Sequence, residues 1–183
     1  SAEEAKKVEK NYHVMYEVSD EWLEAKLLEA SKLGYAELAF GLRLRTPLLA
    51  RTVMGSSMKA NISSAEARTA GNALSGQSYG LLNCKAANDF MERVYASPYK
   101  YDIMPVMQIH DAQYYIFPDD VDIVKWVNDN LIECMSWQDL PELQHDIVKL
   151  GAELDLYISW DKPITLKNNI SIEEIYDTVS KHT

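Results

Sequence analysis

Residues 103 to 117, Ile-Met-Pro-Val-Met-Gln-Ile-His-Asp-Ala-Gln-Tyr-Tyr-Ile-Phe, decide the expected fold of the C-terminal half of the chain. The apolar run from Ile103 to Ile109 predicts a buried strand, and the β-favouring residues from Gln113 to Phe117 predict a returning strand. His110 and Asp111 stand between the two runs as a tight turn. We therefore expect an antiparallel β-hairpin with two polar side chains at its tip.

Helix signals flank this hairpin on both sides. A serine followed three residues later by a glutamate forms a capping box, and this pattern predicts helix starts at Ser1, Ser63 and Ser171. Pro118-Asp119-Asp120 predicts another start, because acids are favoured at the positive end of the helix dipole. With the apolar spacing, the expected helices run from 1 to about 15, from 19 or 20 to 34, from 63 to about 95, from 118 to about 135, and briefly after 171.

Further strands are expected at 35 to 40, at 42 to 45 and within 147 to 159. Gly41 marks a tight bend, Gly151 breaks the last strand, and 46 to 62 is irregular. Strict alternation from Leu42 to Arg45 places Arg43 and Arg45 on one face. Together these elements predict an α+β domain in which helices cover an antiparallel sheet.

The composition is that of a folded chain with an excess of acid. The 183 residues include 18 Lys+Arg and 28 Asp+Glu, a formal charge of −10, and 47% are hydrophobic. This content excludes a disordered polymer, and no apolar run is long enough for a membrane-spanning helix. The polar N-terminus is unlike a signal peptide, and Cys84 and Cys134 fit no disulfide framework. We expect a soluble, cytoplasmic protein without a membrane partner and with two free, buried thiols.

The charge is unevenly distributed along the chain. Between residues 38 and 88, six basic side chains face the single acid Glu66, a local charge of +5. Because screening limits the field to about 8 Å at physiological salt, a local basic segment can bind phosphate even on an acidic chain. A solvated surface without a ligand is the alternative. The basic residues are Arg43, Arg45, Arg51, Lys59, Arg68 and Lys85.

The hairpin tip is the first candidate site. Gln108, His110 and Asp111 gather there between apolar strands. A carboxylate in this position can hold Mg²⁺, which takes one or two protein carboxylates together with phosphate oxygens of a substrate. The alternative is a structural turn in which Asp111 bonds nearby backbone.

The long predicted helix carries the second candidate site. Arg68, Asn72 and Tyr79 are spaced to share one helix face. A cation, an amide and a phenol in a row can hydrogen-bond minor-groove acceptors, which are present at every base pair, and so grip a duplex without reading its sequence. The alternative is a solvated face.

Three segments, taken in order and spacing, resemble one family. They are Gly41-Leu-Arg-Leu-Arg-Thr-Pro47, Ala67-Arg-Thr-Ala-Gly-Asn-Ala73 and Gln108-Ile-His-Asp111. The set resembles the C-terminal palm region of family A DNA polymerases, the DNA polymerase I family, in its bacteriophage form. The resemblance covers roughly residues 1 to 162, as palm with the end of the fingers, and leaves 163 to 183 as a C-terminal extension with a short helix.

The resemblance implies roles for the polar residues. Asp111 matches the motif C aspartate that binds Mg²⁺ in a two-metal site for nucleotidyl transfer. His110 matches the family histidine beside the primer terminus, and Gln108 is assigned to DNA binding. Arg68 and Asn72 match residues that hydrogen-bond the duplex near the growing end.

The remaining basic residues are assigned to the DNA backbone. Arg43 and Arg45 resemble the family segment that meets the backbone, and Arg51 and Lys59 are generic phosphate contacts. All four lie in the stretch of local charge +5.

The sequence departs from the family pattern at two places. Ala112 stands where the family has an acid after His-Asp. The family order Gln-Gly is reversed in Gly76-Gln77, so Gln77 lies five residues beyond Asn72 and points away from it in a regular helix. Either the helix is locally distorted or the minor-groove glutamine is missing.

The resemblance also implies that parts of the enzyme lie elsewhere. The family needs a second metal-binding aspartate and a fingers helix that binds the incoming nucleotide, and both come upstream of the region matched here. One carboxylate cannot hold two ions about 4 Å apart. We therefore expect a chain that is inactive alone: an excised fragment or a subunit of a split DNA polymerase that acts in replication. Its expected partners are primer-template DNA, deoxynucleoside triphosphates and an upstream polypeptide.

Two further expectations concern association. Met15, Trp22 and Leu23 lose their partners if the upstream part is absent, so the chain is expected to expose them or to self-associate.

The other functional class that fits the sequence is a non-catalytic, acidic interaction module in which the His-Asp turn is structural.

Overall fold

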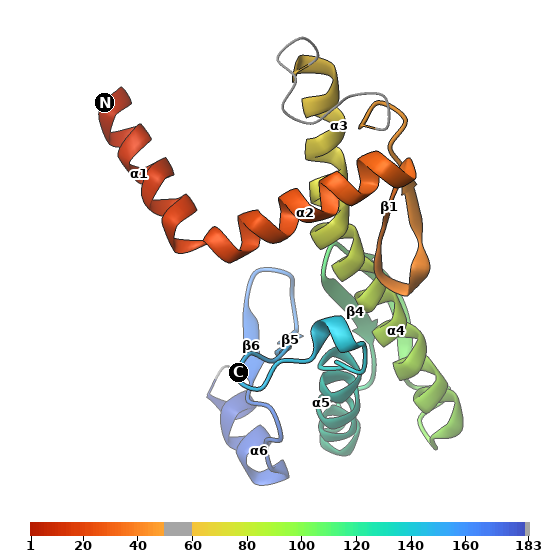
Figure 1. Cartoon of the computed structure of the whole chain (residues 1–183). Coiled ribbons are helices and arrows are strands. Elements are labelled where there is room, and N and C mark those ends of the chain that lie inside the picture. Colours follow the sequence, from red (N-terminus) through yellow and green to blue (C-terminus); the bar gives the residue numbers. More distant parts are fainter. Residues whose placement is uncertain (50–59, 182–183) are drawn as a thin grey trace. The chain divides into compact units, whose positions relative to one another are not determined.

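The structure is a computed structural model that describes residues 1–49 and 60–181. These residues form an α+β protein with antiparallel strands, as the sequence predicts. The chain divides into two compact units, Ser1–Tyr79 and Gly80–Thr183, and Figure 1 labels most of their helices and strands.

The N-terminal unit begins with two successive helices, α1 (Ala2–Met15) and α2 (Glu17–Leu33). The capping box at Ser1 is confirmed, since the Ser1 hydroxyl accepts from the Glu4 backbone N–H at 3.3 Å. The chain bends at Tyr16, so α2 begins slightly before the predicted start at Ser19. It ends at Gly34, whose φ of 78° is the left-handed conformation that glycine adopts readily.

A short antiparallel pair follows, made of β1 (Tyr35–Glu37) and β2 (Arg43–Arg45), with Tyr35 opposite Arg45. Between them the turn η1 (Ala39–Gly41) has positive φ at Phe40 and Gly41, which shortens the predicted strand. Arg43 and Arg45 are exposed on either side of half-buried Leu44, as the alternation predicts.

The long helical segment consists of α3 (Ala60–Asn72), the π-helical turn η3 (Ala73–Gln77) and α4 (Ser78–Ala96). Helix α3 begins before Ser63, so the predicted capping box there is wrong. Glu66 instead accepts a hydrogen bond from the Leu49 backbone N–H at 2.5 Å. Helix α3 packs on α2, and a Cβ at Gly71 would lie only 3.2 Å from Leu23 Cδ1.

In the C-terminal unit, β3 (Met104–Ile109) pairs antiparallel with β4 (Ala112–Ile116), and His110 and Asp111 form the turn between Ile109 and Ala112. All six residues of β3 are exposed, so the prediction of a buried strand is wrong. The buried residue of that run is Ile103, which precedes the strand. Strand β4 packs on α4 through Tyr115, whose ring lies 4.9 Å from that of Phe90.

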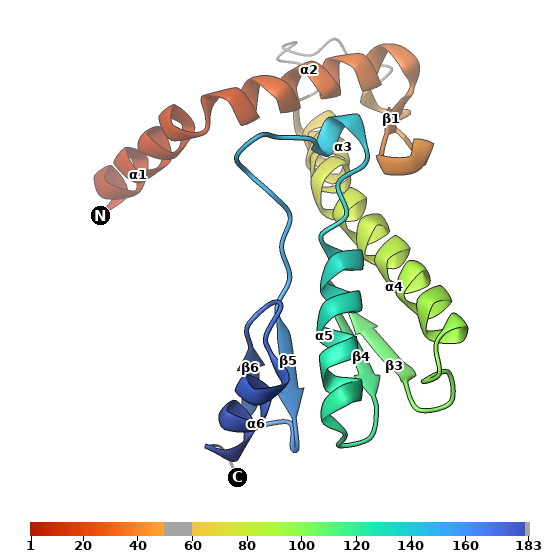
Figure 2. The same cartoon turned by 90° about the horizontal axis from the view of Figure 1, so that it is seen from below.

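Helix α5 (Val121–Met135) lies in the core of this unit, where Val127 and Leu131 join Phe90 and Val94 of α4. The Asp120 carboxylate caps it by accepting from two backbone N–H groups. Figure 2 shows α5 beside the β3–β4 pair.

The chain then passes through the short turn η4 (Pro141–Leu143) to β5 (Leu154–Tyr157), β6 (Pro163–Leu166) and α6 (Ile172–Ser180). Strand β5 covers only part of the predicted 147 to 159, and β6, which pairs with it, was not predicted. The capping box of Ser171 and Glu174 is confirmed. The described strands thus form three separate two-stranded sheets, which corrects the expectation of a single sheet.

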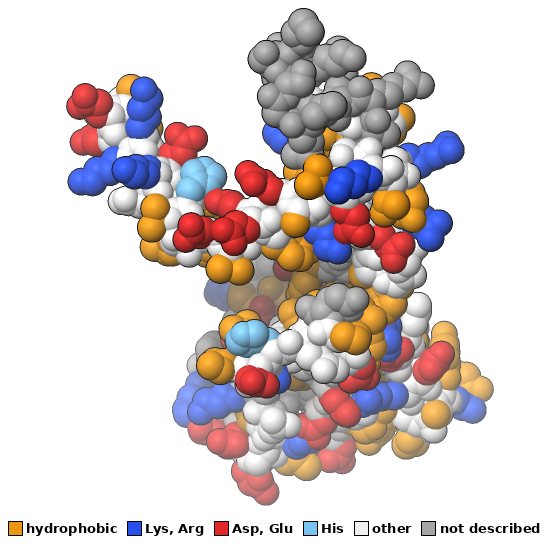
Figure 3. Space-filling view, viewed as in Figure 1, with side chains coloured by type: hydrophobic (Ala, Val, Ile, Leu, Met, Phe, Trp, Pro, Cys, Tyr) orange, Lys and Arg blue, Asp and Glu red, His pale blue; other side chains and the backbone are white. Residues whose placement is uncertain are grey.

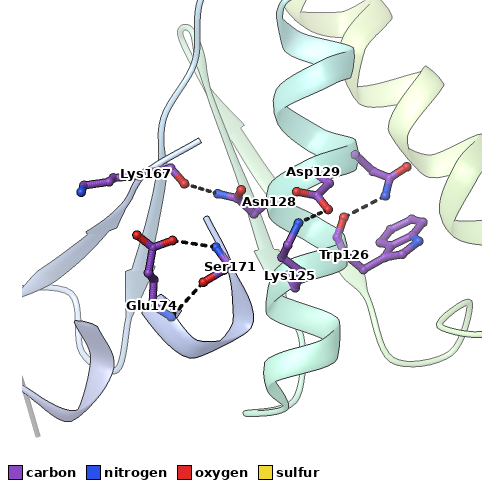
Figure 4. A network of polar contacts seen from close by, with 8 residues as sticks. Lys125, Trp126, Asn128, Asp129, Lys167, Ser171 and Glu174 are labelled. Carbon is purple, nitrogen blue, oxygen red and sulfur yellow. Dashed lines mark hydrogen bonds and ion pairs between the residues drawn. The ribbon is translucent and has the colours of Figure 1, made fainter. Parts of the chain in front are cut away.

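A hydrogen bond joins α5 to the link between β6 and α6 (Figure 4). Asn128 of α5 is wholly buried, and its amide donates to the Lys167 backbone carbonyl at 3.3 Å. Lys125 and Asp129 form an ion pair along the same helix. The residues after β6 also pack against the core of this unit, where Ile170 and Ile175 are buried.

Candidate functional site

The π-helical turn decides where Gln77 points. In a π turn the backbone bonds join residues five apart, so a residue five positions beyond Asn72 returns to the same side of the helix. Arg68, Asn72 and Gln77 accordingly line one shallow hollow of the N-terminal unit, with Ala65 and Thr69. Of the two alternatives left by the sequence, the locally distorted helix is the one observed.

Gly76 leaves room for the Asn72 side chain in this hollow. A Cβ built on Gly76 would lie 3.0 Å from Asn72 Oδ1, closer than side chains normally approach. A larger residue at position 76 would therefore push the amide of Asn72 aside. The reversed order Gly76-Gln77 and the π turn together allow both amides to face the same hollow.

The structure describes two of the four predicted phosphate contacts, Arg43 and Arg45. Arg43 is exposed; its guanidinium lies 4.5 Å from the centre of the Tyr35 ring, and its Nε lies 3.6 Å from Glu37 Oε2. Arg45 lies on the same exposed face of β2. Arg51 and Lys59 lie outside the described residues.

The hairpin tip presents its polar residues to solvent. Gln108, His110 and Asp111 are all exposed, and Gln108 contacts the thiol of Cys84. Cys84 is itself exposed, which corrects the expectation that both thiols are buried. The turn is tied to α4, because Asn83 Nδ2 donates to the His110 backbone carbonyl at 3.2 Å.

The residues around Asp111 fit only part of a magnesium site. Among residues 1–49 and 60–181, no group of three or more His, Cys, Asp or Glu side chains is arranged to hold a metal ion. One exposed carboxylate is enough for a Mg²⁺ ion that takes its other ligands from water and substrate phosphates, but not for a pair of ions.

Helix α1, with the start of α2, and strand β3 both expose apolar side chains. Helix α1 buries no residue, and Met15 and Trp22 are 74% and 47% exposed, as predicted. Leu23 is instead partly buried against the core of the N-terminal unit. Figure 3 shows acidic and basic side chains mixed along α1, with hydrophobic side chains beside them.

The second surface is strand β3. Among the described strands it pairs with β4 alone, so its other edge is unpaired. The cross-strand pairs Met104–Ile116 and Met107–Tyr114 are apolar. Exposed apolar edge strands of this kind are normally covered by another strand or element.

Comparison with known proteins finds no match: no family model fits the sequence, and neither a curated protein nor a solved structure is significantly similar to it. No helix in the described part of the chain is both long enough and apolar enough to cross a membrane.

Sequence reasoning missed Asn83 and Gln113, which support the hairpin turn. Gln113 Nε2 donates to the backbone and side-chain oxygens of Asn83 at 2.9 and 2.6 Å. The available signal was spacing: Asn83 lies on the buried stripe of α4 that continues through Ala86 and Phe90. A polar residue in such a stripe needs a bonding partner.

Proposed function

We propose that this chain is the palm part of a family A DNA polymerase of bacteriophage type, which acts in DNA replication and is completed by an upstream polypeptide. The observation that carries the proposal is the hollow on the long helix, where the π turn brings Gln77 together with Arg68 and Asn72. These are the three side chains for which the resemblance implies contacts to the DNA duplex.

In this proposal the hollow holds primer-template DNA near the growing end. The guanidinium of Arg68 and the amides of Asn72 and Gln77 donate to acceptors that every base pair presents in the minor groove. Arg43 and Arg45 add contacts to the DNA backbone. Such contacts position the duplex and do not select a sequence.

Asp111 supplies one carboxylate of the metal site, and His110 lies beside the primer terminus. Bound Mg²⁺ would activate the primer 3′-hydroxyl and hold the triphosphate of the incoming deoxynucleotide. The second carboxylate must come from the upstream polypeptide, so the chain alone is expected to be inactive. The unpaired edge of β3, next to the turn, supports completion by a strand from another polypeptide.

Binding of primer-template DNA by the full chain tests the contacts at the hollow. Arg68→Ala and Asn72→Ala should each weaken binding about tenfold, which corresponds to about 1.4 kcal/mol. Arg68→Lys should recover little, because an ammonium keeps the charge but loses the planar fork. Lys32→Ala removes an exposed cation from α2 and serves as the charge control. Equal affinity of all four variants would contradict the proposal.

Primer extension tests the assignment of Asp111. With an upstream polypeptide that supplies the second aspartate, the chain should extend a primer, and Asp111→Ala should abolish extension. Extension that survives this substitution would rule out the metal role. Without the upstream polypeptide no extension is expected.

The second candidate function is a non-catalytic interaction module. The exposed strand β3 and helix α1, which buries no residue, favour it because both present apolar surface to a protein partner. Tight, DNA-independent capture of a protein together with no measurable DNA binding would support this function over the polymerase.

A further inference from the structure

Asn83 is a buried polar residue next to the hairpin turn. It lies on α4, is 4% exposed, and shares its buried face with Ala86 and Phe90. An unpaired amide at such a position would be costly, so its bonds should be strong constraints on its neighbours.

The bonds of Asn83 form a chain that runs in one direction. The His110 backbone carbonyl can only accept, so Asn83 must present its NH₂ group there, at 3.2 Å. Asn83 Oδ1 then faces Gln113, which must present its own NH₂ group, at 2.6 Å. The remaining oxygen of Gln113 accepts from the Tyr115 hydroxyl at 2.6 Å.

Tyr115 closes this chain as a donor. The pKa of its phenol is raised to about 12, chiefly by burial, so the proton stays in place near neutral pH. Each amide therefore has one favoured orientation, because acceptor-only backbone carbonyls fix both: that of His110 orients Asn83, and that of Asn83, at 2.9 Å, orients Gln113.

The turn needs such support because of its backbone. His110 has a φ of 52°, in the left-handed region that a residue with a Cβ adopts only at a cost. In a two-residue hairpin turn, a first position with positive φ is normally occupied by glycine, asparagine or aspartate. The bond from Asn83 holds the carbonyl of this strained residue, and Asp111 follows it directly.

We infer that Asn83 is a positioning residue for Asp111: its amide, oriented by Gln113 and Tyr115, holds His110 in the conformation that presents the Asp111 carboxylate. The inference rests on the proposed role of Asp111 in the polymerase site. It implies that α4, which carries Asn83, helps to position this metal ligand.

Nuclear magnetic resonance of the full chain tests the turn itself. A residue with positive φ gives a strong intraresidue NOE between its amide and α protons, which we expect for His110 in the wild type. Asn83→Ala should lose this signal while the amide spectrum of α5 and α6 stays native. Asn88→Ala, at an exposed position on the same helix, should keep it. Retention of the His110 signal in Asn83→Ala would overturn the inference.

A second variant guards against unfolding. Gln113→Leu keeps Asn83 but removes the group that orients it, so the His110 signal should weaken. If Asn83→Ala does not fold, an unchanged His110 signal in Gln113→Leu would overturn the inference.

Mn²⁺ separates this inference from the proposed function. Added Mn²⁺ should broaden the Asp111 amide signal of the wild type, and Asn83→Ala should require about tenfold more Mn²⁺, the usual effect of losing a residue that orients a metal ligand. No broadening in the wild type would count against the polymerase site. In that case, loss of the His110 signal in Asn83→Ala would still support the part of the inference in which Asn83 fixes the conformation of the turn.

Discussion

Gly76 is the residue on which the geometry of the hollow depends most directly. Replacing it with alanine should stabilise the helix by up to about 1 kcal/mol, because glycine is the poorer helix former. The new Cβ would lie 3.0 Å from Asn72 Oδ1, so the Asn72 amide must shift by a few tenths of an ångström from its position at the hollow. We expect Gly76→Ala to raise thermal stability while it weakens DNA binding several-fold.

Gly80→Ala is the matched control for this change. A Cβ at Gly80 has nothing within 4 Å, so the same gain in helix propensity comes without a contact. Thermal melts and DNA titrations of both variants check the prediction. Equal DNA affinity of the two would show that Asn72 does not act through the position seen here.

The two cysteines should react at very different rates. Cys84 is exposed, whereas Cys134 is buried in the core, and burial raises the pKa of the Cys134 thiol. Because the thiolate is the reactive form, a thiol reagent at neutral pH should label one cysteine rapidly and the second only after denaturant is added. Cys84→Ser should remove the fast phase, and two fast phases in the native wild type would contradict the burial of Cys134.

At the scale of the element, helix caps were well predicted because they depend on local chemistry. Ser1 and Ser171 each cap a helix through a glutamate three residues later. The same pattern failed at Ser63, since the helix begins at Ala60 and Glu66 bonds Leu49 instead. A local sequence pattern therefore identifies a possible cap, but one residue of the pattern can form a tertiary hydrogen bond instead.

Burial of a strand was harder to predict than the strand itself. The hairpin turn and both strands lie where the sequence places them, but β3 is exposed. A short apolar run is consistent with a buried strand, but the run alone does not show that anything covers it. Pro163 begins β6, a position where proline is tolerated in a strand, and this start gave no clear strand signal.

The candidate site was predictable in its residues but not in its geometry. Arg68 and Asn72 follow from a spacing of four in a regular helix, whereas Gln77 needs the π turn to reach them. No periodic pattern predicts such a turn, because it interrupts the period itself. The role of Asn83 could not be predicted from local spacing either, because its hydrogen-bond partners lie on the hairpin, far away in sequence.

The bend between α1 and α2 should depend on pH. His13 Nδ1 lies 2.7 Å from Asp20 Oδ2, and this hydrogen bond raises the pKa of His13 above its ordinary value of 6.5. A raised pKa means that the charged pair stabilises the bend fully below pH 6.5, and that this stabilisation is lost as pH rises through the higher value. Helicity by circular dichroism should therefore fall slightly as the pH is raised from 5.5 to 8.5.

Asp20→Asn is the control for this titration, because it removes the carboxylate but keeps the shape of the side chain. The pH-dependent part of the helicity should then disappear. A variant that titrates like the wild type would show that another group is responsible.

At the scale of the whole molecule, the exposed apolar residues and the single carboxylate lead to the same expectation. Within residues 1–49 and 60–181, Met15 and Trp22 are exposed, β3 pairs on one edge only, and no metal-binding group of three acids, histidines or cysteines includes Asp111. An upstream polypeptide of the proposed polymerase would supply cover for the apolar side chains, a strand partner for β3 and a second acid. Without it, apolar surfaces of this kind drive association between copies.

We therefore expect the purified chain to self-associate through α1 and α2. Trp22→Ser should raise the dissociation constant at least tenfold, because buried tryptophans are among the strongest contributors to interfaces. Ile147→Ser removes an equally apolar side chain that is 86% exposed on the C-terminal unit, and it should have no effect. Sedimentation over a range of concentrations provides the measurement, and a wild type that remains monomeric at high concentration would contradict the prediction. Addition of the upstream polypeptide should replace the homomeric species with a complex of two different chains, because both associations need the same apolar surface.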